Sequence, residues 1–375
     1  MKVNISRPLI REAFWLLPFV FLTLCALALA RPWRTIPPVS EGRAILDGQG
    51  RTVIIPEPLP GVVTSTYLSD FLIMTHSPET ILKAGGPRER PKPNALSIYP
   101  LLFRIFPQVV FDDALWDFPG DIETIAAKDV GGVHLISRMH FDVFGFKTVD
   151  FGPPTYEQPD EVIAIRTLIL NRLIGQEERA GAIVDRHMRV YKELAAELRP
   201  DTLMERPRAI SAISPTNEWT RAYATFYFDG RAELINAAKD FPVLGRESDA
   251  ERILAINPDM IVLYVGDFKG FTRDPRWRGL EAVRNRRVYT NVPFNRTTYD
   301  VDGRSLGTRW VAELAYPDRL QPKLRELLRD HYLESYNYRL TEAELDELLN
   351  VEENEGAAFY ERFLRAGEGK NRDES

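Results

Sequence analysis

Arginine and aromatic residues stand at or just beyond the ends of several predicted strands, where a ligand would meet them. These residues are Tyr67, Arg138, Trp219, Arg221, Tyr264 and Arg296. An arginine guanidinium offers a planar fork of donors to carboxylates or to the anionic oxygens of a chelate, and Trp and Tyr supply rigid, flat contact area. The set predicts a ligand-binding pocket. Core packing of each aromatic ring and a solvated loop position for each arginine are the competing interpretations.

Histidine gives little support for direct binding of a bare metal ion. The chain has five histidines, and no two of them have HxH or HxxxH spacing. A metal site needs several His, Asp or Glu side chains that converge, so we predict none. A bound haem would need only one Tyr or His ligand, for which Tyr67, His140 and Tyr264 are candidates.

No motif indicates catalysis. The chain contains no GxSxG, no P-loop and no HExxH sequence, and these motifs mark the common nucleophilic, nucleotide-binding and zinc-hydrolase sites. Cys25 is the only cysteine, and cleavage beyond it would leave a mature chain without thiol chemistry. We predict a protein that is not an enzyme, with no catalytic residue and no cofactor beyond its ligand.

Length and charge limit the remaining classes. The 375 residues suggest about two domains. The net charge is −6 and the pI is about 5.6, so no dominant basic face is indicated and we predict no nucleic-acid partner.

The first thirty residues differ from the rest. Three basic residues precede an uncharged run over 13–30, which ends in the small-x-small sequence Ala28-Leu29-Ala30. This pattern predicts a signal peptide, cleaved near Arg31, or an uncleaved membrane anchor. Lipidation at Cys25 is a third interpretation. Each places the chain in the periplasm or on the extracytoplasmic face of the cytoplasmic membrane, behind a Pro-rich tether over 31–45.

The elements that would position the pocket fall into two halves. Short strands alternate with helical segments over 46–158 and again over 201–350, which predicts an α/β fold of two lobes with parallel-type sheets flanked by helices. A turn signal at 47–50 predicts a β-hairpin near the start. Residues 351–375 are charge-rich and predict a charged tail with a helix near 357–366.

One long amphipathic stretch separates the halves. Apolar residues recur at helical spacing over 161–198, which predicts a linking helix over 159–200 that bridges the lobes. Asp160 is the predicted N-cap, and Pro200 would end the helix. Gly175 lies inside the stretch, so a break into two helices is the alternative.

Five stretches carry a family resemblance. In chain order they are DGQGRTVIIPEPLPGVV, GDIETIAAKDVGGVHLI, DAERILAINPDMIVL, RDPRWRGLEAVRNRRVYTNVP and the pair WVAELAYPDRL and YNYRLTEAELDELL. Together they resemble the periplasmic substrate-binding proteins of ABC importers, in the class for iron–siderophores, haem, cobalamin or metal ions whose two lobes are joined by a long helix. The sequence departs from the family at 129–132, where DVGG replaces the usual Pro-Asp.

The resemblance implies a function and partners. A surface glutamate on each lobe of these proteins docks with the importer permease subunits, and the matching positions are Glu123 and Glu251. Exposed carboxylates of this kind would set the register of docking more than its affinity. A helix N-terminal acid favoured by the macrodipole is the competing interpretation of each.

The expected function is therefore capture of an iron chelate of siderophore type, or a related large ligand, by a monomer that delivers it to the permease. Haem, cobalamin, a bare metal ion and a non-transporting sensor of the same fold remain alternatives.

Overall fold

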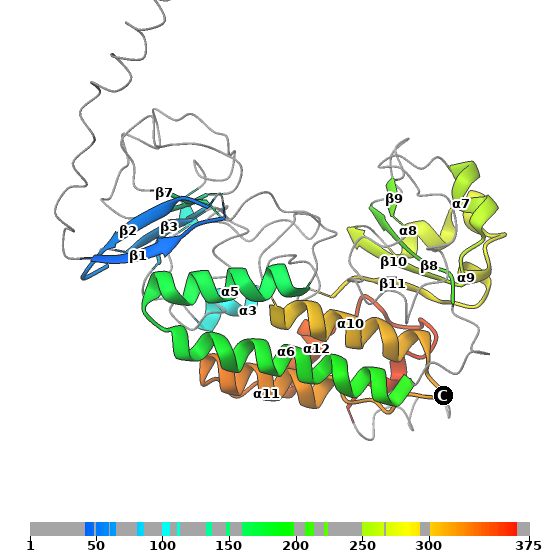
Figure 1. Ribbon diagram of the computed structural model, residues 1–375. Coiled ribbons are helices and arrows are strands. Elements are labelled where there is room, and N and C mark those ends of the chain that lie inside the picture. Colours follow the sequence, from blue (N-terminus) through cyan, green and yellow to red (C-terminus); the bar gives the residue numbers. More distant parts are fainter. Residues whose placement is uncertain are drawn as a thin grey trace, which may run out of the picture.

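The computed structural model describes residues 42–48, 50–59, 61–64, 81–85, 100–105, 111–112, 133–136, 148–150, 160–198, 207–213, 221–223, 250–265, 268–292 and 301–365. They form two sheets that lie at opposite ends of a layer of helices, with a hairpin beside the first sheet (Figure 1). None of the helices within these ranges is long and apolar enough to cross a membrane.

The N-terminal lobe begins with the predicted hairpin. Strands β1 (Gly42–Leu46) and β2 (Thr52–Pro56) pair antiparallel. The turn closes because Arg51 donates its backbone N–H and its side chain to the buried carboxylate of Asp47. Strand β1 starts inside the range predicted as a tether (31–45), so that tether prediction extends too far.

A parallel sheet follows, in the order β5 (Phe111–Asp112), β4 (Ile81–Gly85), β3 (Val62–Thr64), β6 (Val133–Ile136) and β7 (Thr148–Asp150). Every neighbouring pair is parallel. Helix α3 (Pro100–Ile105) lies between β4 and β5 in the sequence.

The C-terminal lobe contains the sheet β11 (Val288–Thr290), β10 (Met260–Val265), β8 (Ala209–Ile213) and β9 (Arg221–Tyr223), in which only β9 is antiparallel. Helix α7 (Ala250–Ile256) leads into β10. Helix α8 (Phe268–Arg273), the 3-10 turn η6 (Pro275–Trp277) and helix α9 (Glu281–Arg284) connect β10 to β11. Both lobes therefore have the predicted parallel-type sheets.

The predicted single helix over 159–200 is two helices, α5 (Asp160–Ile174) and α6 (Glu177–Leu198), which pack against each other. Gly175 has a φ of +73°, in the left-handed region that glycine adopts without strain. The N–H of Gln176 donates to the carbonyl of Asn171 at 2.7 Å and closes the turn. Helix α6, about 33 Å long, runs below both lobes in Figure 1 and packs against α5 and α10.

The closing helices are α10 (Val301–Ala315), α11 (Leu324–Tyr336) and α12 (Glu342–Leu348). The charged tail predicted over 351–375 is wrong for residues 351–365, which pack on this layer. Tyr360 and Phe363, in the 3-10 turn η8 (Tyr360–Phe363), are buried, and the side chain of Asn354 bonds the backbone of Thr290. Of the helix predicted near 357–366, the part that the structure describes contains only the short 3-10 helix η8.

One hydrophobic core joins these parts. It extends from Ile45 and Ile55 of the hairpin, through Leu194 of α6, to Tyr360 and Phe363 near the end of the described chain. A second, smaller core lies in the C-terminal lobe around Trp277, which stacks on Phe271 at 5.3 Å between ring centres.

Candidate functional site

The strand order of each sheet locates a candidate ligand crevice. In the N-terminal lobe, β3 is followed by β4 and β5 on one side and by β6 and β7 on the other. The order therefore reverses between β3 and β6, and ligands of open α/β sheets bind outside the carboxyl ends of the strands at such a point. Thr64 ends β3 and pairs with Leu135 of β6, so both strands end at the same edge.

Two predicted ligand residues follow these two strands in the sequence. Tyr67 comes three residues after the end of β3, and Arg138 comes two residues after the end of β6. Both lie outside the described residues, so their side chains remain predictions.

The C-terminal lobe has the same arrangement, with its reversal between β8 and β10. Ile213, the last residue of β8, pairs with Val265 of β10 on one side and with Arg221 of β9 on the other. Because Tyr264 precedes Val265, the backbones of Arg221 and Tyr264 lie at one carboxyl edge, about 10 Å apart across two strand spacings. The structure thus brings two predicted ligand residues together at the edge where a ligand is expected.

Of the other predicted site residues, some lie within the described residues and some do not. Three of them lie outside the described residues: Trp219 in the connection from β8 to β9, Arg296 in the connection from β11 to α10, and Glu123. Glu251 lies in the first turn of α7 and is exposed. Its placement on a surface helix is compatible with docking and equally with a helix N-terminal acid.

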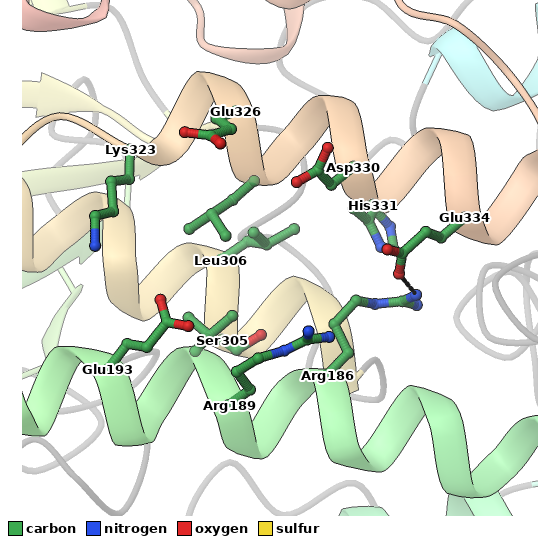
Figure 2. Close-up of a pocket in the computed structure, with 12 residues that line it drawn as sticks. Arg186, Arg189, Glu193, Ser305, Leu306, Lys323, Glu326, Asp330, His331 and Glu334 are labelled. Atoms are coloured by element: carbon green, nitrogen blue, oxygen red, sulfur yellow. Dashed lines mark hydrogen bonds and ion pairs between the residues drawn. The ribbon is translucent and has the colours of Figure 1, made fainter.

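A groove that sequence reasoning did not identify lies between α6 and α11, over α10 (Figure 2). Its volume is about 260 Å³. Ion pairs lie toward its two ends: Arg186 with Glu334 at 2.8 Å, and Lys323 with Glu197 at 2.8 Å. The first pair joins the middle of α6 to the end of α11, and the second joins the end of α6 to Lys323, the N-cap of α11, which shows that the two helices run antiparallel.

The interior of this groove has apolar and charged parts. Leu306 of α10 lies on its floor, while Arg189, Glu193, Glu326 and Asp330 line it from α6 and α11. None of these four charged side chains makes an ion pair or hydrogen bond with the part of the chain that the structure describes. Helices α6, α10 and α11, which line the groove, belong to the helical layer that lies below the two sheets in Figure 1.

At one end of the groove, a partly buried network of hydrogen bonds holds Glu197 between Arg309 and Lys323. Burial of Glu197 opposes its ionisation, but hydrogen bonds from Arg309 and Lys323 outweigh this and hold its pKa below the usual value. At the other end, Arg186 donates to Ser335, whose hydroxyl contacts the buried His331 at 3.2 Å. Within the described residues no group of three His, Cys, Asp or Glu side chains could hold a metal ion.

Solved structures share this two-lobed architecture. A periplasmic solute-binding protein of Veillonella parvula is 18% identical and matches with a TM-score of 0.62, over 84% of this chain and 98% of its own. The periplasmic binding protein MolA of Haemophilus influenzae, bound to molybdate, is 16% identical, with a TM-score of 0.63 over 80% of this chain and 99% of its own. The chain has the fold of periplasmic solute-binding proteins.

A third protein with the solute-binding-protein fold differs in its ligand. The triscatecholate siderophore-binding protein FeuA of Bacillus subtilis, in complex with ferri-bacillibactin, is 14% identical, with a TM-score of 0.52 over 74% of this chain and 99% of its own. No protein-family model matches the sequence, and no curated protein matches it. The structural matches show the fold of the chain, and at these low identities they do not show its ligand.

Proposed function

We propose that the chain is the extracytoplasmic substrate-binding component of an ABC importer, and that it captures an iron chelate of siderophore type or a related large anionic ligand. One observation carries the proposal. In both lobes the predicted arginine and aromatic residues, except Arg296 after β11, stand at or after the strands beside the reversal of the sheet order, the position at which sheets of this kind bind ligands.

The residues of the crevice favour an anionic ligand over a bare cation. Arg138 comes from the N-terminal lobe and Arg221 and Arg296 from the C-terminal lobe, so a ligand between the lobes would meet guanidinium groups from both sides. Three such groups match the anionic oxygens of a chelate. They would repel a bare metal ion.

The fold alone does not choose the ligand, because its relatives bind molybdate in one case and ferri-bacillibactin in another. Trp219, Tyr67 and Tyr264 add flat contact area, which suits a bulky chelate better than a small oxyanion.

Location and partners follow from the same proposal. The apolar run over 13–30 would direct the chain across the cytoplasmic membrane, where it acts as a monomer and not as an enzyme. Glu251 on α7 and Glu123 on the other lobe would each meet a basic site on the permease subunits.

A titration tests the ligand class. The wild type is titrated with a panel of ferric siderophores, haem, cobalamin, molybdate and divalent metal ions. Alanine replacement of Arg138, Arg221 or Arg296 should weaken binding of the preferred ligand by about ten- to a hundredfold, the effect of losing a hydrogen bond that involves a charged group.

Lysine at the same position should restore only part of the affinity, because the planar fork is lost. The matched control is Arg189→Ala on α6, an exposed arginine outside the crevice, which should leave affinity unchanged. A wild type that binds only a bare divalent metal ion would refute the proposed ligand class.

A further inference from the structure

The connection from β10 to β11 carries a concentration of positive charge. Residues 268–287 contain seven basic and two acidic side chains, a net charge of +5 in a chain whose net charge is −6. Six of the basic residues are exposed, and they define what we call the basic crossover surface: Lys269, Arg273, Arg276, Arg278, Arg284 and Arg286. Such a local reversal of sign indicates an anionic partner.

Two of these six basic residues form ion pairs with acidic residues of the same connection. Asp274 pairs with Arg276 at 2.5 Å, and Glu281 pairs with Arg284. Both acidic residues of the connection are therefore already engaged.

Three arginines remain. The exposed side chains of Arg273, Arg278 and Arg286 make no hydrogen bond or ion pair with any residue that the structure describes. Their three positive charges lie between positions 273 and 286 and repel each other, and no contact of the described residues offsets this repulsion.

The surface is rigid. Trp277 is fully buried and stacks on Phe271, which fixes α8 against η6. The backbone N–H of Glu281 donates to the side chain of Asn257 at 2.8 Å, which fixes α9 against the segment after α7. A partner would therefore meet charges whose backbone is already ordered. Figure 1 shows α8 and α9 in the C-terminal lobe, away from the N-terminal sheet.

The composition of the surface distinguishes between partners. Protein interfaces need a central apolar or aromatic anchor, and none of the exposed large hydrophobic residues of the described chain lies in 268–287. An anionic lipid surface needs no such anchor, because it attracts each basic residue by charge alone. We propose that the basic crossover surface binds the anionic headgroups of a phospholipid bilayer.

The expected strength follows from the charge. Each basic residue near an anionic membrane contributes a factor of roughly five to binding, so the three unpaired arginines together contribute on the order of a hundredfold. The attraction is screened by salt, and binding should weaken strongly as ionic strength rises.

Vesicle sedimentation tests this. The exported protein, as isolated from cells, is mixed with vesicles of phosphatidylglycerol and phosphatidylcholine, or of phosphatidylcholine alone. The neutral vesicles measure any contribution of the apolar N-terminal run. Replacing Arg273 and Arg278 with Gln and Arg286 with Asn should reduce binding to the anionic vesicles by on the order of a hundredfold. Asn is chosen because residue 286 has a φ of +55°.

The matched control changes the net charge by the same amount elsewhere. Arg189, Lys192 and Arg339 are exposed, and their Gln variant should bind as the wild type does. The three single variants of the basic crossover surface, each weaker by roughly fivefold, keep the test decisive if the triple variant folds poorly.

Three results would overturn the proposal. The wild type could show no preference for anionic vesicles. Both triple variants could lose binding equally, which would assign the effect to net charge. Retention on immobilised polyglutamate without binding to vesicles would assign the surface to an acidic protein. None of these outcomes depends on the ligand of the crevice, so the proposed function is tested separately.

Discussion

The buried ion pair between Arg309 and Glu313 offers the sharpest test of the packing between helices α6, α10 and α11. The two side chains are 1% and 0% exposed, and Nε of Arg309 donates to Oε1 of Glu313 at 2.6 Å. The same oxygen accepts the backbone N–H of Lys323 at 2.9 Å, and Arg309 also reaches Glu197 at 3.1 Å and the carbonyl of Gln321 at 2.7 Å. The pair thus connects three helices.

Glu313→Ala should lower the free energy of unfolding by about 3–5 kcal/mol, because it leaves a buried guanidinium with only part of its partners. Urea unfolding measures the change as the shift in midpoint multiplied by the slope. Replacing both residues, Arg309→Met with Glu313→Leu, should cost less than the sum of the two single changes, since no unpaired charge remains buried.

Glu342→Ala is the matched control. Glu342 pairs with Arg325 and Arg329, but its side chain is 45% exposed, and exposed pairs contribute at most about 1 kcal/mol. If the two alanine variants lost the same stability, within about 1 kcal/mol, burial would not be the cause and the reasoning would fail.

Three further outcomes are expected. Burial opposes ionisation of Asp259, but hydrogen bonds from Arg208 outweigh it and lower its pKa. The pair therefore stabilises the fold above about pH 4 and loses its effect as the pH falls through the folded pKa, and acid titration of Asp259→Asn should show a shallower loss of stability. Gly175→Ala should cost more than about 1 kcal/mol in urea unfolding, because φ is positive and the new Cβ would lie 2.5 Å from the guanidinium of Arg43; in an Arg43→Ala background only the backbone part should remain. Glu251→Lys should impair uptake while ligand affinity, measured by titration, stays within twofold, and a folded variant that lost its ligand would contradict the docking role.

Elements that carry a local signal can be predicted from the sequence. The hairpin around Asp47 has its turn residues in sequence, and β10 is a short apolar run behind a helix. Helix α12 begins at Thr341 with a capping box to Glu344, a pattern of four residues. In each case neighbouring residues supply the stabilising contact, so the sequence alone is sufficient to predict the element.

The wrong predictions concern segments whose structure depends on contacts with residues distant in the sequence. The single helix predicted over 159–200 is broken at Gly175, where a break into two helices was the alternative, and the apolar residues Ile165 and Leu168 of α5 are exposed. Residues 351–365 are rich in charge, yet Arg362 donates to carbonyls in the last turn of α10 and in the segment after it, including that of Leu320 at 2.5 Å. A polar side chain that finds a buried partner forty residues away leaves no local pattern.

The arrangement of the candidate ligand residues also depends on contacts between segments distant in the sequence. Strand ends are visible in the sequence, so Arg221 and Tyr264 could be proposed as ligand residues. That they lie at one edge depends on β8 pairing with both β9 and β10, which only the structure supplies. The groove between α6 and α11 unites residues more than a hundred positions apart, and no spacing pattern indicated it.

The extent of the main core has a consequence for biosynthesis. Ile45 and Ile55 belong to the same core as Tyr360 and Phe363, so the first hairpin and the last turn of the described chain complete one interior. Chains emerge from the ribosome N-terminus first, and this core cannot close until residue 363 has been made. The interior of the nascent polypeptide therefore stays incomplete throughout nearly all of its translation.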